Sequence, residues 1–492
     1  MSTSAPVSRA SVGLRSERGP ILLALMVATA LVAMDATIVA TTVHTIVGEI
    51  GGREQYPWLF SVYMLTAAVT TPVYAKLADT LGRKPVIIFG ILLFMVASVL
   101  CGVAWNMPAL IVGRALQGLG GGAIMPISIT IMGDIYSLAE RAVAQGYVAS
   151  VWAVSSVLGP TLGGLFSEFG IWRGVFFVNI PLCLMAVIFL ARNFHENFVR
   201  TRHRIDIAGA LLLSSALTLI LLGVLEGGVA WEWLSLPSIG SFVVGIALLI
   251  AFVLVERRAA EPVLPIWVFR RPIIATGFIL NFALGGLLIG YTAFVPSYLE
   301  GSLGVSPLIA GLALATLTIG WPIASTVSGR FYLKIGFRST ILIGSGLVFA
   351  TSLGIAALSP TPNAWAIAAV LFCTGLGLGL TAVPSLIAVQ SSVGWEERGV
   401  ATGTVMLSRS LGQAVGAGVL GAVATLVLTS LADDPTSPAA VTLSSSAVFV
   451  GSAVIALVML IAAVVFPRGD ATGSGLGDTR STPVVDAIVD AD

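Results

Sequence analysis

Fourteen apolar runs, each long enough to cross a lipid bilayer as a helix, follow one another along this chain. A helix rises about 1.5 Å per residue, so about 20 apolar residues span a hydrocarbon core that is ~30 Å thick. The runs fall near residues 21–47, 58–78, 85–105, 108–132, 141–167, 174–191, 206–226, 236–255, 272–299, 306–330, 338–358, 364–390, 399–428 and 446–466. We therefore predict an all-α membrane protein with fourteen transmembrane helices.

The composition leaves little room for anything else. Of the 492 residues, 57% are hydrophobic and only 10% are charged, against about 25% charged in soluble domains. Loops between the runs reach about 17 residues at most, too short for a separate soluble domain of about 50 residues. Cys101, Cys183 and Cys373 lie in apolar runs without a C-x-x-C spacing, which predicts neither a disulfide framework nor a metal site.

The basic residues predict the topology. With a cytoplasmic N-terminus, 21 of the 25 Lys and Arg residues fall on the inner side, two (Arg53 and Arg173) fall outside, and two (Arg114 and Arg409) lie within helices. This distribution obeys the positive-inside rule. We expect a multi-pass protein of the cell membrane with both termini in the cytoplasm and an uncleaved first span.

The chain also repeats itself. Residues 75–84 align with residues 329–338, so that Gly82 falls on Gly336, 254 positions later. The first six runs therefore correspond to the last six, as in transporters that rock about a site at the membrane midplane. The predicted parts are a cytoplasmic tail (1–20), an N-terminal six-helix bundle (21–191), a linker with two extra transmembrane helices (192–271), a C-terminal six-helix bundle (272–466) and a disordered cytoplasmic tail (467–492).

Asp35 is the formal charge within the first run. It lies about 21 Å from the start of that helix, well inside the hydrocarbon core. An aspartate there costs about 2.5–3.5 kcal/mol, so it needs a partner, a proton or a water-filled cavity. A simple hydrogen bond to a neighbouring helix is the ordinary alternative. Because intramembrane acids are rare and mostly functional, we predict that Asp35 belongs to the functional site.

Two arginines accompany it inside the membrane. Arg114 lies about 10 Å below the outer boundary and Asp35 about 9 Å below it, so the two can pair. An arginine that only fixes helix packing is the alternative. Arg409 lies about 16 Å into its helix, where lining a cavity and fixing a helix junction are equally compatible with the sequence.

Short motifs carry a resemblance to a known family. Residues 77–84 read LADTLGRK, similar to the G-x-L-A-D-R-x-G-R-K motif of the major facilitator superfamily, with Ala75 and Thr80 as departures. Gly82 permits a tight turn, while Arg83 and Lys84 hold the inner face by charge. The resemblance implies that Asp79 contacts the helix start near Arg398. It also implies that Arg83 pairs with Asp134, latching an outward-facing form.

Three more motifs narrow the resemblance to the fourteen-helix drug:proton antiporter branch. Residues 34–39 keep the Asp35 and Thr37 of its first-helix signature, and residues 114–122 resemble R-x-x-Q-G-x-G, in which close packing is the expected role of Gln117. Residues 155–164 resemble the antiporter motif G-x-x-x-G-P-x-x-G-G, in which Pro160 is expected to bend the helix. The matching positions of that motif are Ser155, Gly159, Pro160, Gly163 and Gly164.

These features predict a proton-coupled secondary exporter of small lipophilic or amphipathic compounds. Asp35 would take up a proton when facing outward and release it when facing inward, loosening from and returning to Arg114. A tentative substrate cavity comprises Asp35, Thr37, Gln117 and Arg409. No catalytic residue, metal or cofactor is expected, and the partners are protons, the substrate and the lipid bilayer, without nucleic acid. A monomer is expected.

Other functions stay open from sequence. A proton-coupled exporter of a lipid, a siderophore or another metabolite fits the same scaffold, and a facilitative importer fits less well because of the antiporter motif. No G-x-x-x-x-G-K-[ST] motif supplies an ATP site. With His44, His195 and His203 as the three histidines, and neither H-E-x-x-H nor G-x-S-x-G, an intramembrane enzyme is disfavoured. A channel is disfavoured because no symmetric filter is evident.

Overall fold

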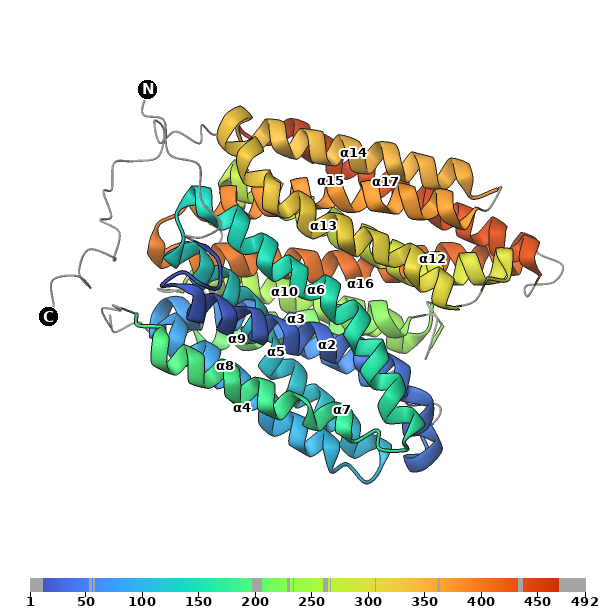
Figure 1. The fold of residues 1–492 in the computed structure, drawn as a ribbon, viewed down its shortest axis with the longest axis horizontal. Coiled ribbons are helices and arrows are strands. Elements are labelled where there is room, and N and C mark those ends of the chain that lie inside the picture. The colour runs from blue at the N-terminus through green and yellow to red at the C-terminus, as the bar shows by residue number, and fades with distance from the viewer. Residues whose placement is uncertain are drawn as a thin grey trace, which may run out of the picture.

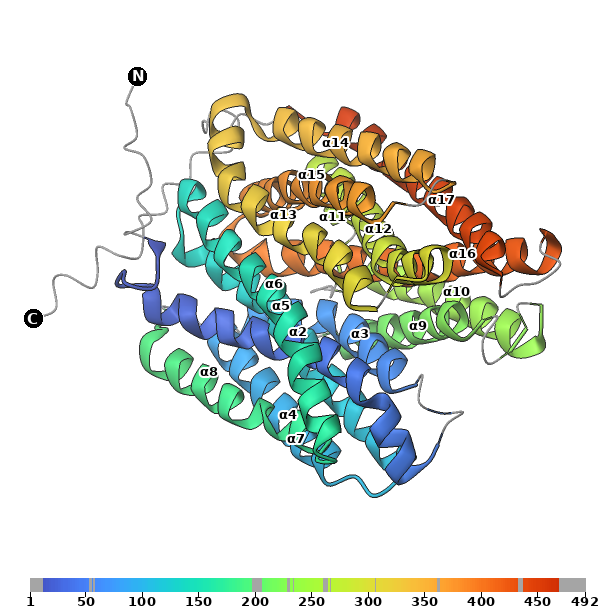
Figure 2. The same cartoon turned by 45° about the vertical axis from the view of Figure 1, so that its right-hand side comes forward.

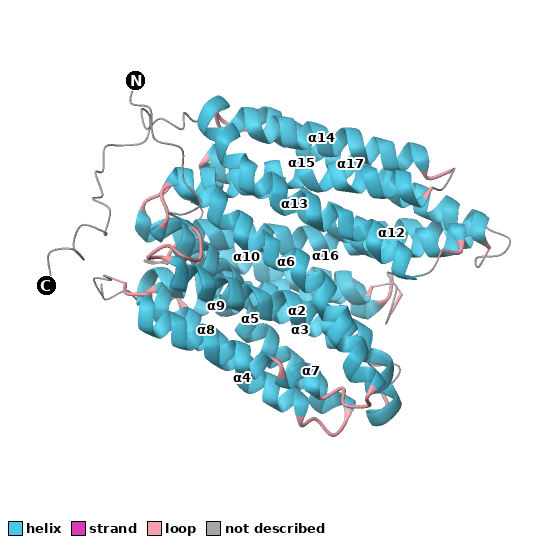
Figure 3. Ribbon diagram, in the orientation of Figure 1, coloured by secondary structure: helices cyan, strands magenta, loops and turns pink. Residues whose placement is uncertain are grey.

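The computed structural model describes residues 12–468, except 53–54, 56–57, 197–205, 228–230, 233, 260–263, 266, 306, 361–362 and 432–436. Within these residues every regular element is a helix, joined by short loops (Figure 3). Arg53, most of the predicted C-terminal tail, the first part of the N-terminal tail and several linker residues lie outside the described residues.

The helices follow the predicted apolar runs and mostly exceed them at the ends. The first group is α2 (Gly19–Ile50), α3 (Trp58–Leu81), α4 (Arg83–Gly102), α5 (Met107–Ile135), α6 (Leu138–Glu168), α7 (Gly174–Phe177) and α8 (Asn179–Asn193). Next come α9 (Ile207–Glu226), α10 (Leu236–Glu256) and the short α11 (Trp267–Arg270). The last group is α12 (Pro272–Leu303), α13 (Pro307–Ile335), α14 (Phe337–Leu358), α15 (Ala364–Ser391), the 3-10 turn η1 (Trp395–Glu397), α16 (Arg398–Leu431) and α17 (Pro438–Val465).

The first and last groups form two bundles with the same internal packing. In the N-terminal bundle α2 packs on α6, α3 on α5 and α4 on α5; in the C-terminal bundle α12 packs on α16, α13 on α15 and α14 on α15. Figure 1 shows the C-terminal bundle, yellow to red, above the N-terminal bundle, blue to green. The pairs correspond in the order that the sequence repeat predicts.

Two glycines mark equivalent corners of the bundles. Gly82 precedes α4 with φ of 96°, and Gly336 precedes α14 with φ of 83°. A side chain is disfavoured in this left-handed region, so glycine suits both turns. We call the end of the molecule that contains Gly82 and Gly336 the basic end, because Lys84 and Arg338 follow these turns; the other is the far end.

The bundles meet along two flanks. On one flank α6 packs against α13, and on the other α3 packs against α16. The inserted helices α9 and α10 lie side by side, and α9 contacts both α3 and α16 (Figure 2). The insertion therefore covers one of the two seams between the bundles.

Twelve helices of the described part are long and apolar enough to cross a membrane. The apolar stretch of α9, Ala208–Val224, is shorter than these. α6 is not among these twelve. The described part of the chain is thus all-helical with twelve candidate membrane spans, while the count of fourteen stays a prediction.

Candidate functional site

Asp35 lies midway along α2 and is 1% exposed. Its carboxylate forms a salt bridge with the guanidinium of Arg114 on α5, which is also buried. The structure thus brings together the two charges that the sequence places at similar depth. A buried ion pair is tolerated only where further hydrogen bonds satisfy both ions.

Two amides supply those hydrogen bonds. Gln117 Nε2 donates to Asp35 Oδ1 at 2.9 Å and to Ser98 Oγ at 2.9 Å. Asn179 Nδ2 donates to the same two oxygens at 3.3 Å each. The side chains come from four helices, α2, α4, α5 and α8. Close packing and a place in the tentative cavity were predicted for Gln117; the structure adds that its amide bridges Asp35, Ser98 and Arg114.

Arg114 has partners besides the carboxylate. Its Nε donates to the carbonyl oxygen of Leu59 at 3.0 Å, and its Nη1 donates to Gln117 Oε1 at 2.8 Å. The guanidinium also lies 4.3 Å from the centre of the Tyr63 ring, a cation–π distance. Arg114 therefore keeps its place through contacts that do not depend on the charge of Asp35.

Thr37 connects this site to α6. Its hydroxyl donates to the carbonyl oxygen of Ser155 at 3.2 Å and to the carbonyl of Met34 in its own helix at 3.0 Å. A Cβ placed on Gly159 would lie 1.9 Å from Thr37 Oγ1. Glycine at 159 is thus what lets α6 approach α2 next to the buried acid.

The other glycines of the antiporter motif differ in burial. Gly163 is buried, whereas Gly164 is exposed and a Cβ there would meet nothing within 4 Å. Close packing is therefore not what Gly164 does in this conformation. The side chain of Pro160 lies outside the described residues, so the bend expected from it stays a prediction.

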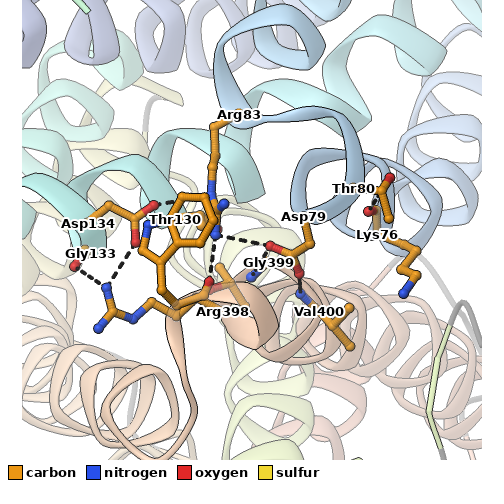
Figure 4. A network of polar contacts seen from close by, with 12 residues as sticks. Lys76, Asp79, Thr80, Arg83, Thr130, Gly133, Asp134, Arg398, Gly399 and Val400 are labelled. Atoms are coloured by element: carbon orange, nitrogen blue, oxygen red, sulfur yellow. Dashed lines mark hydrogen bonds and ion pairs between the residues drawn. The ribbon is translucent and has the colours of Figure 1, made fainter. Parts of the chain in front are cut away.

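Asp79 joins the bundles at the basic end. Its carboxylate accepts hydrogen bonds from the backbone N–H groups of Gly399 at 3.0 Å and Val400 at 2.8 Å (Figure 4). These are orphan donors in the first turn of α16, where a negative charge also meets the positive end of the helix dipole. Asp79 thus caps a helix of the opposite bundle.

Asp134 makes a second link beside it. Its carboxylate lies 3.1 Å from Arg83 Nε in its own bundle and accepts from Arg398 of α16 at 3.0 Å. Arg83 is fully buried, donates to Asp79 Oδ1 at 3.1 Å and lies over the Trp395 ring at 3.7 Å. The predicted pair of Arg83 with Asp134 and the predicted contact of Asp79 with this helix start are both present, in one network (Figure 4).

Glu196 holds the turn at Gly82 and was not singled out from sequence. Its two carboxylate oxygens accept from the backbone N–H groups of Arg83 and Lys84, each at 3.0 Å. Lys84 Nζ donates in turn to the carbonyl of Ala191 at 2.9 Å. The chain after α8 thereby caps the start of α4.

Arg409 lies apart from these networks, on α16. Its Nη2 donates to Asn281 Oδ1 on α12 at 2.8 Å. The tentative cavity set is thus split: Asp35, Thr37 and Gln117 belong to the N-terminal bundle, and Arg409 belongs to the C-terminal one.

Comparison with known proteins decides the family. The sequence profile of the Major Facilitator Superfamily matches residues 25–417. The chain belongs to the Major Facilitator Superfamily. Multidrug resistance protein 3 of Bacillus subtilis is 34% identical over 415 residues, 84% of this chain and 81% of that protein. Multidrug resistance protein fnx1 of Schizosaccharomyces pombe is 30% identical over 429 residues, 83% of this chain and 79% of that protein.

A solved structure agrees on the fold. The crystal structure of the human organic anion transporter MFSD10 (TETRAN) is similar with a TM-score of 0.60, covering 89% of this chain and 99% of that one. At 15% identity the likeness concerns the fold alone. Family and relatives together make this chain a multi-pass membrane transporter and not an enzyme.

Several residues of the site were missed for a common reason. Ser98, Tyr63 and Asn281 are single polar positions in apolar runs, and such positions are frequent in membrane helices. Asn179 lies near the start of the sixth apolar run, whose sequence predicts no partner for it. Which of these polar residues faces Asp35 depends on how each helix is rotated about its own axis, and the sequence does not give that rotation.

Proposed function

We propose that this superfamily member is a proton-coupled antiporter that exports small lipophilic or amphipathic compounds from the cell. The proposal is carried by one observation: a carboxylate at the middle of a spanning helix, closed off from water and held by Arg114, Gln117 and Asn179. The names of the relatives, multidrug resistance proteins in a bacterium and a yeast, support the substrate class. The proposal retains fourteen spans and a basic end in the cytoplasm.

A path for coupling follows from the contacts. Protonation neutralises Asp35 and weakens its ion pair with Arg114, which stays held by Leu59 and Tyr63. Loss of this ion pair lets α2 shift, and Thr37 of α2 donates a hydrogen bond to the backbone of α6. Since α6 packs against α13 of the other bundle, a shift at α2 biases the seam between the bundles. Proton binding then favours one of the two rocking states, as alternating access requires.

The closed basic end fits the outward-facing half of such a cycle. Asp79 and Asp134 tie the N-terminal bundle to the first turn of α16. On the flank where α13 packs against α6, the hydroxyl of Tyr332 donates to the carbonyl oxygen of Leu138. Release of these links is the step that would open the site to the cytoplasm.

Transport in proteoliposomes with an imposed pH difference tests the proposal. Asp35→Asn removes the ionisable group with little change in volume, so proton-driven dye export is expected to fall about tenfold or more, equivalent to about 1.4 kcal/mol in the barrier. Glu168→Gln, at an exposed carboxylate on α6, is the matched control and should transport normally. An Asp35→Asn protein that still pumps at the normal rate would remove Asp35 from the mechanism, and transport without any pH difference would favour a facilitator.

A further inference from the structure

Arg409 is an intramembrane cation with incomplete pairing. Asn281 accepts from its Nη2, and Asn281 Nδ2 donates on to Ser385 Oγ at 3.3 Å. The Trp321 ring centre lies 5.8 Å from the guanidinium carbon. The Nε of Arg409 is buried and has no hydrogen-bond partner among the described residues. Within the described part of the chain, Asn281 is thus the one hydrogen-bond acceptor given to a side chain with five donors.

The described part of the C-terminal bundle offers no acid at this depth. Residues 272–466 contain five acidic residues. Glu300 lies in the last turn of α12, Glu396 and Glu397 lie in η1, and Asp433 and Asp434 lie outside the described residues. Asp35 of the other bundle is already engaged by Arg114. An uncompensated arginine near the middle of a spanning helix is costly, and such residues are rare. Asp35 thus neutralises Arg114 in the N-terminal bundle, whereas no described acid neutralises Arg409 in the C-terminal bundle.

Arg409 lies on a helix that contacts both bundles. α16 packs on α12 in its own bundle and on α3 and α5 of the other, so it lies at the interface between the repeats. Asn281 is fully buried, whereas Arg409 and Trp321 are half-buried. Superfamily transporters bind substrate near the midplane at that interface.

We propose that Arg409 binds an acidic group of the transported compound, and that the substrates therefore include amphipathic anions bearing a carboxylate or sulfonate. A guanidinium binds such groups through two parallel N–H donors, and the Trp321 indole offers an apolar face to the rest of the molecule. A bound anion would satisfy the free Nε and cancel the buried charge. This inference rests on the proposed export function and names its substrate class.

A purely structural Arg409 is the competing explanation, and one substitution separates the two. Arg409→Gln keeps a donor for Asn281 and removes the charge, while Arg409→Lys keeps the charge and loses the paired donors. Dansylglycine and dansylcadaverine share a fluorophore and carry opposite charges, so they serve as matched probes. Arg338→Gln, at an arginine of the basic end that donates to the carbonyl of Val464, is the control variant.

Equilibrium binding to the purified protein is measured first. Wild type is expected to bind dansylglycine about tenfold more tightly than Arg409→Gln, with Arg409→Lys in between, because the substitution removes one charge-assisted pair. Dansylcadaverine binding should be unchanged or tighter in Arg409→Gln, and Arg338→Gln should match wild type. Equal affinity of wild type and Arg409→Gln for dansylglycine would overturn the inference, as would a parallel loss for both probes with a lowered melting temperature.

Transport of the two probes then separates this inference from the function on which it rests. With a pH difference across proteoliposomes, wild type should move dansylglycine, and Arg409→Gln should do so about tenfold more slowly. If wild type moves neither probe under a gradient, the proposed function fails, while the binding comparison still decides what Arg409 recognises. Wild-type export of dansylcadaverine without export of dansylglycine would contradict the anion assignment alone.

Discussion

Asp134 and Arg398 form a salt bridge across the two bundles, with 3.0 Å between the carboxylate oxygen and the guanidinium nitrogen. Their side chains are 11% and 20% exposed, so water screens the pair only in part. Arg83 shares the same carboxylate from within the N-terminal bundle. The network thus has one anion held by a cation on each side of the seam.

Asp134→Asn is expected to loosen the basic end. Loss of a pair between the exposed and buried extremes costs about 1–3 kcal/mol, which shifts the population toward molecules open at this end. A cysteine introduced at Ser391, which accepts a hydrogen bond from Arg141, reports opening through its labelling rate once the native cysteines are replaced. Labelling should accelerate in Asp134→Asn and stay unchanged in Arg338→Gln. An unchanged rate in Asp134→Asn would show that this salt bridge does not hold the seam.

Gly159→Ala is expected to destabilise the protein through α2. The added Cβ would lie 1.9 Å from Thr37 Oγ1, and overpacking of this kind costs about 1–3 kcal/mol. Thermal unfolding in detergent measures the loss. Thr37→Ala should recover part of it in the double variant, because the clashing hydroxyl is gone. Gly164→Ala is the control, since a Cβ there meets nothing within 4 Å.

Gln117→Ala and Asn179→Ala are expected to slow proton-driven transport by different amounts. Gln117 donates to Asp35 at 2.9 Å and Asn179 at 3.3 Å, so the larger loss belongs to Gln117. Hydrogen bonds to charged groups are worth about 1.5–3 kcal/mol, which corresponds to tenfold or more for Gln117. Asn193→Ala, exposed on the same helix as Asn179, should behave as wild type. Equal transport rates in all three variants would show that the amides of Gln117 and Asn179 take no part in proton coupling.

Glu49→Gln is expected to destabilise the far end at neutral pH and not in acid. Hydrogen bonds from Arg173 and Trp172 hold the pKa of Glu49 below its ordinary value. A lowered carboxyl pKa contributes stability above the unfolded value, about 4.3, and loses it as pH falls through the folded value. The melting temperatures of wild type and Glu49→Gln should therefore differ at pH 7 and converge below pH ~4. A gap that persists in acid would contradict this linkage.

The sequence predicted the helices and the charged pairs better than the surroundings of those pairs. The first predicted run, 21–47, became Gly19–Ile50, since polar residues at the ends continue a helix that hydropathy alone truncates. The sixth, 174–191, is interrupted at Val178 between α7 and α8. Helix ends depend on capping and neighbours, which apolar runs do not encode.

In the candidate site, too, some residues could be predicted from sequence and others could not. Asp35 and Arg114 were found because a charge in lipid needs a partner, and depth along a helix can be counted from sequence. Close packing and the tentative cavity were the roles predicted for Gln117, and its hydrogen bond to Asp35 was not predicted, because the rotation of a residue about the helix axis cannot be counted so well from sequence. Glu196 gave no signal, since its role depends on a loop returning to the turn at Gly82.

The contact of α9 with both α3 and α16 has a mechanical consequence. If α3 and α16 move apart, they must either slide along α9 or move α9 with one of them. The contacts of α9 therefore restrain separation of the bundles at this edge. On the opposite edge α6 packs on α13 and α15, and no described helix of the insertion contacts both bundles there. We expect the two bundles to rotate about the edge formed by α3, α9 and α16, so that the largest separation occurs between α6 and α13.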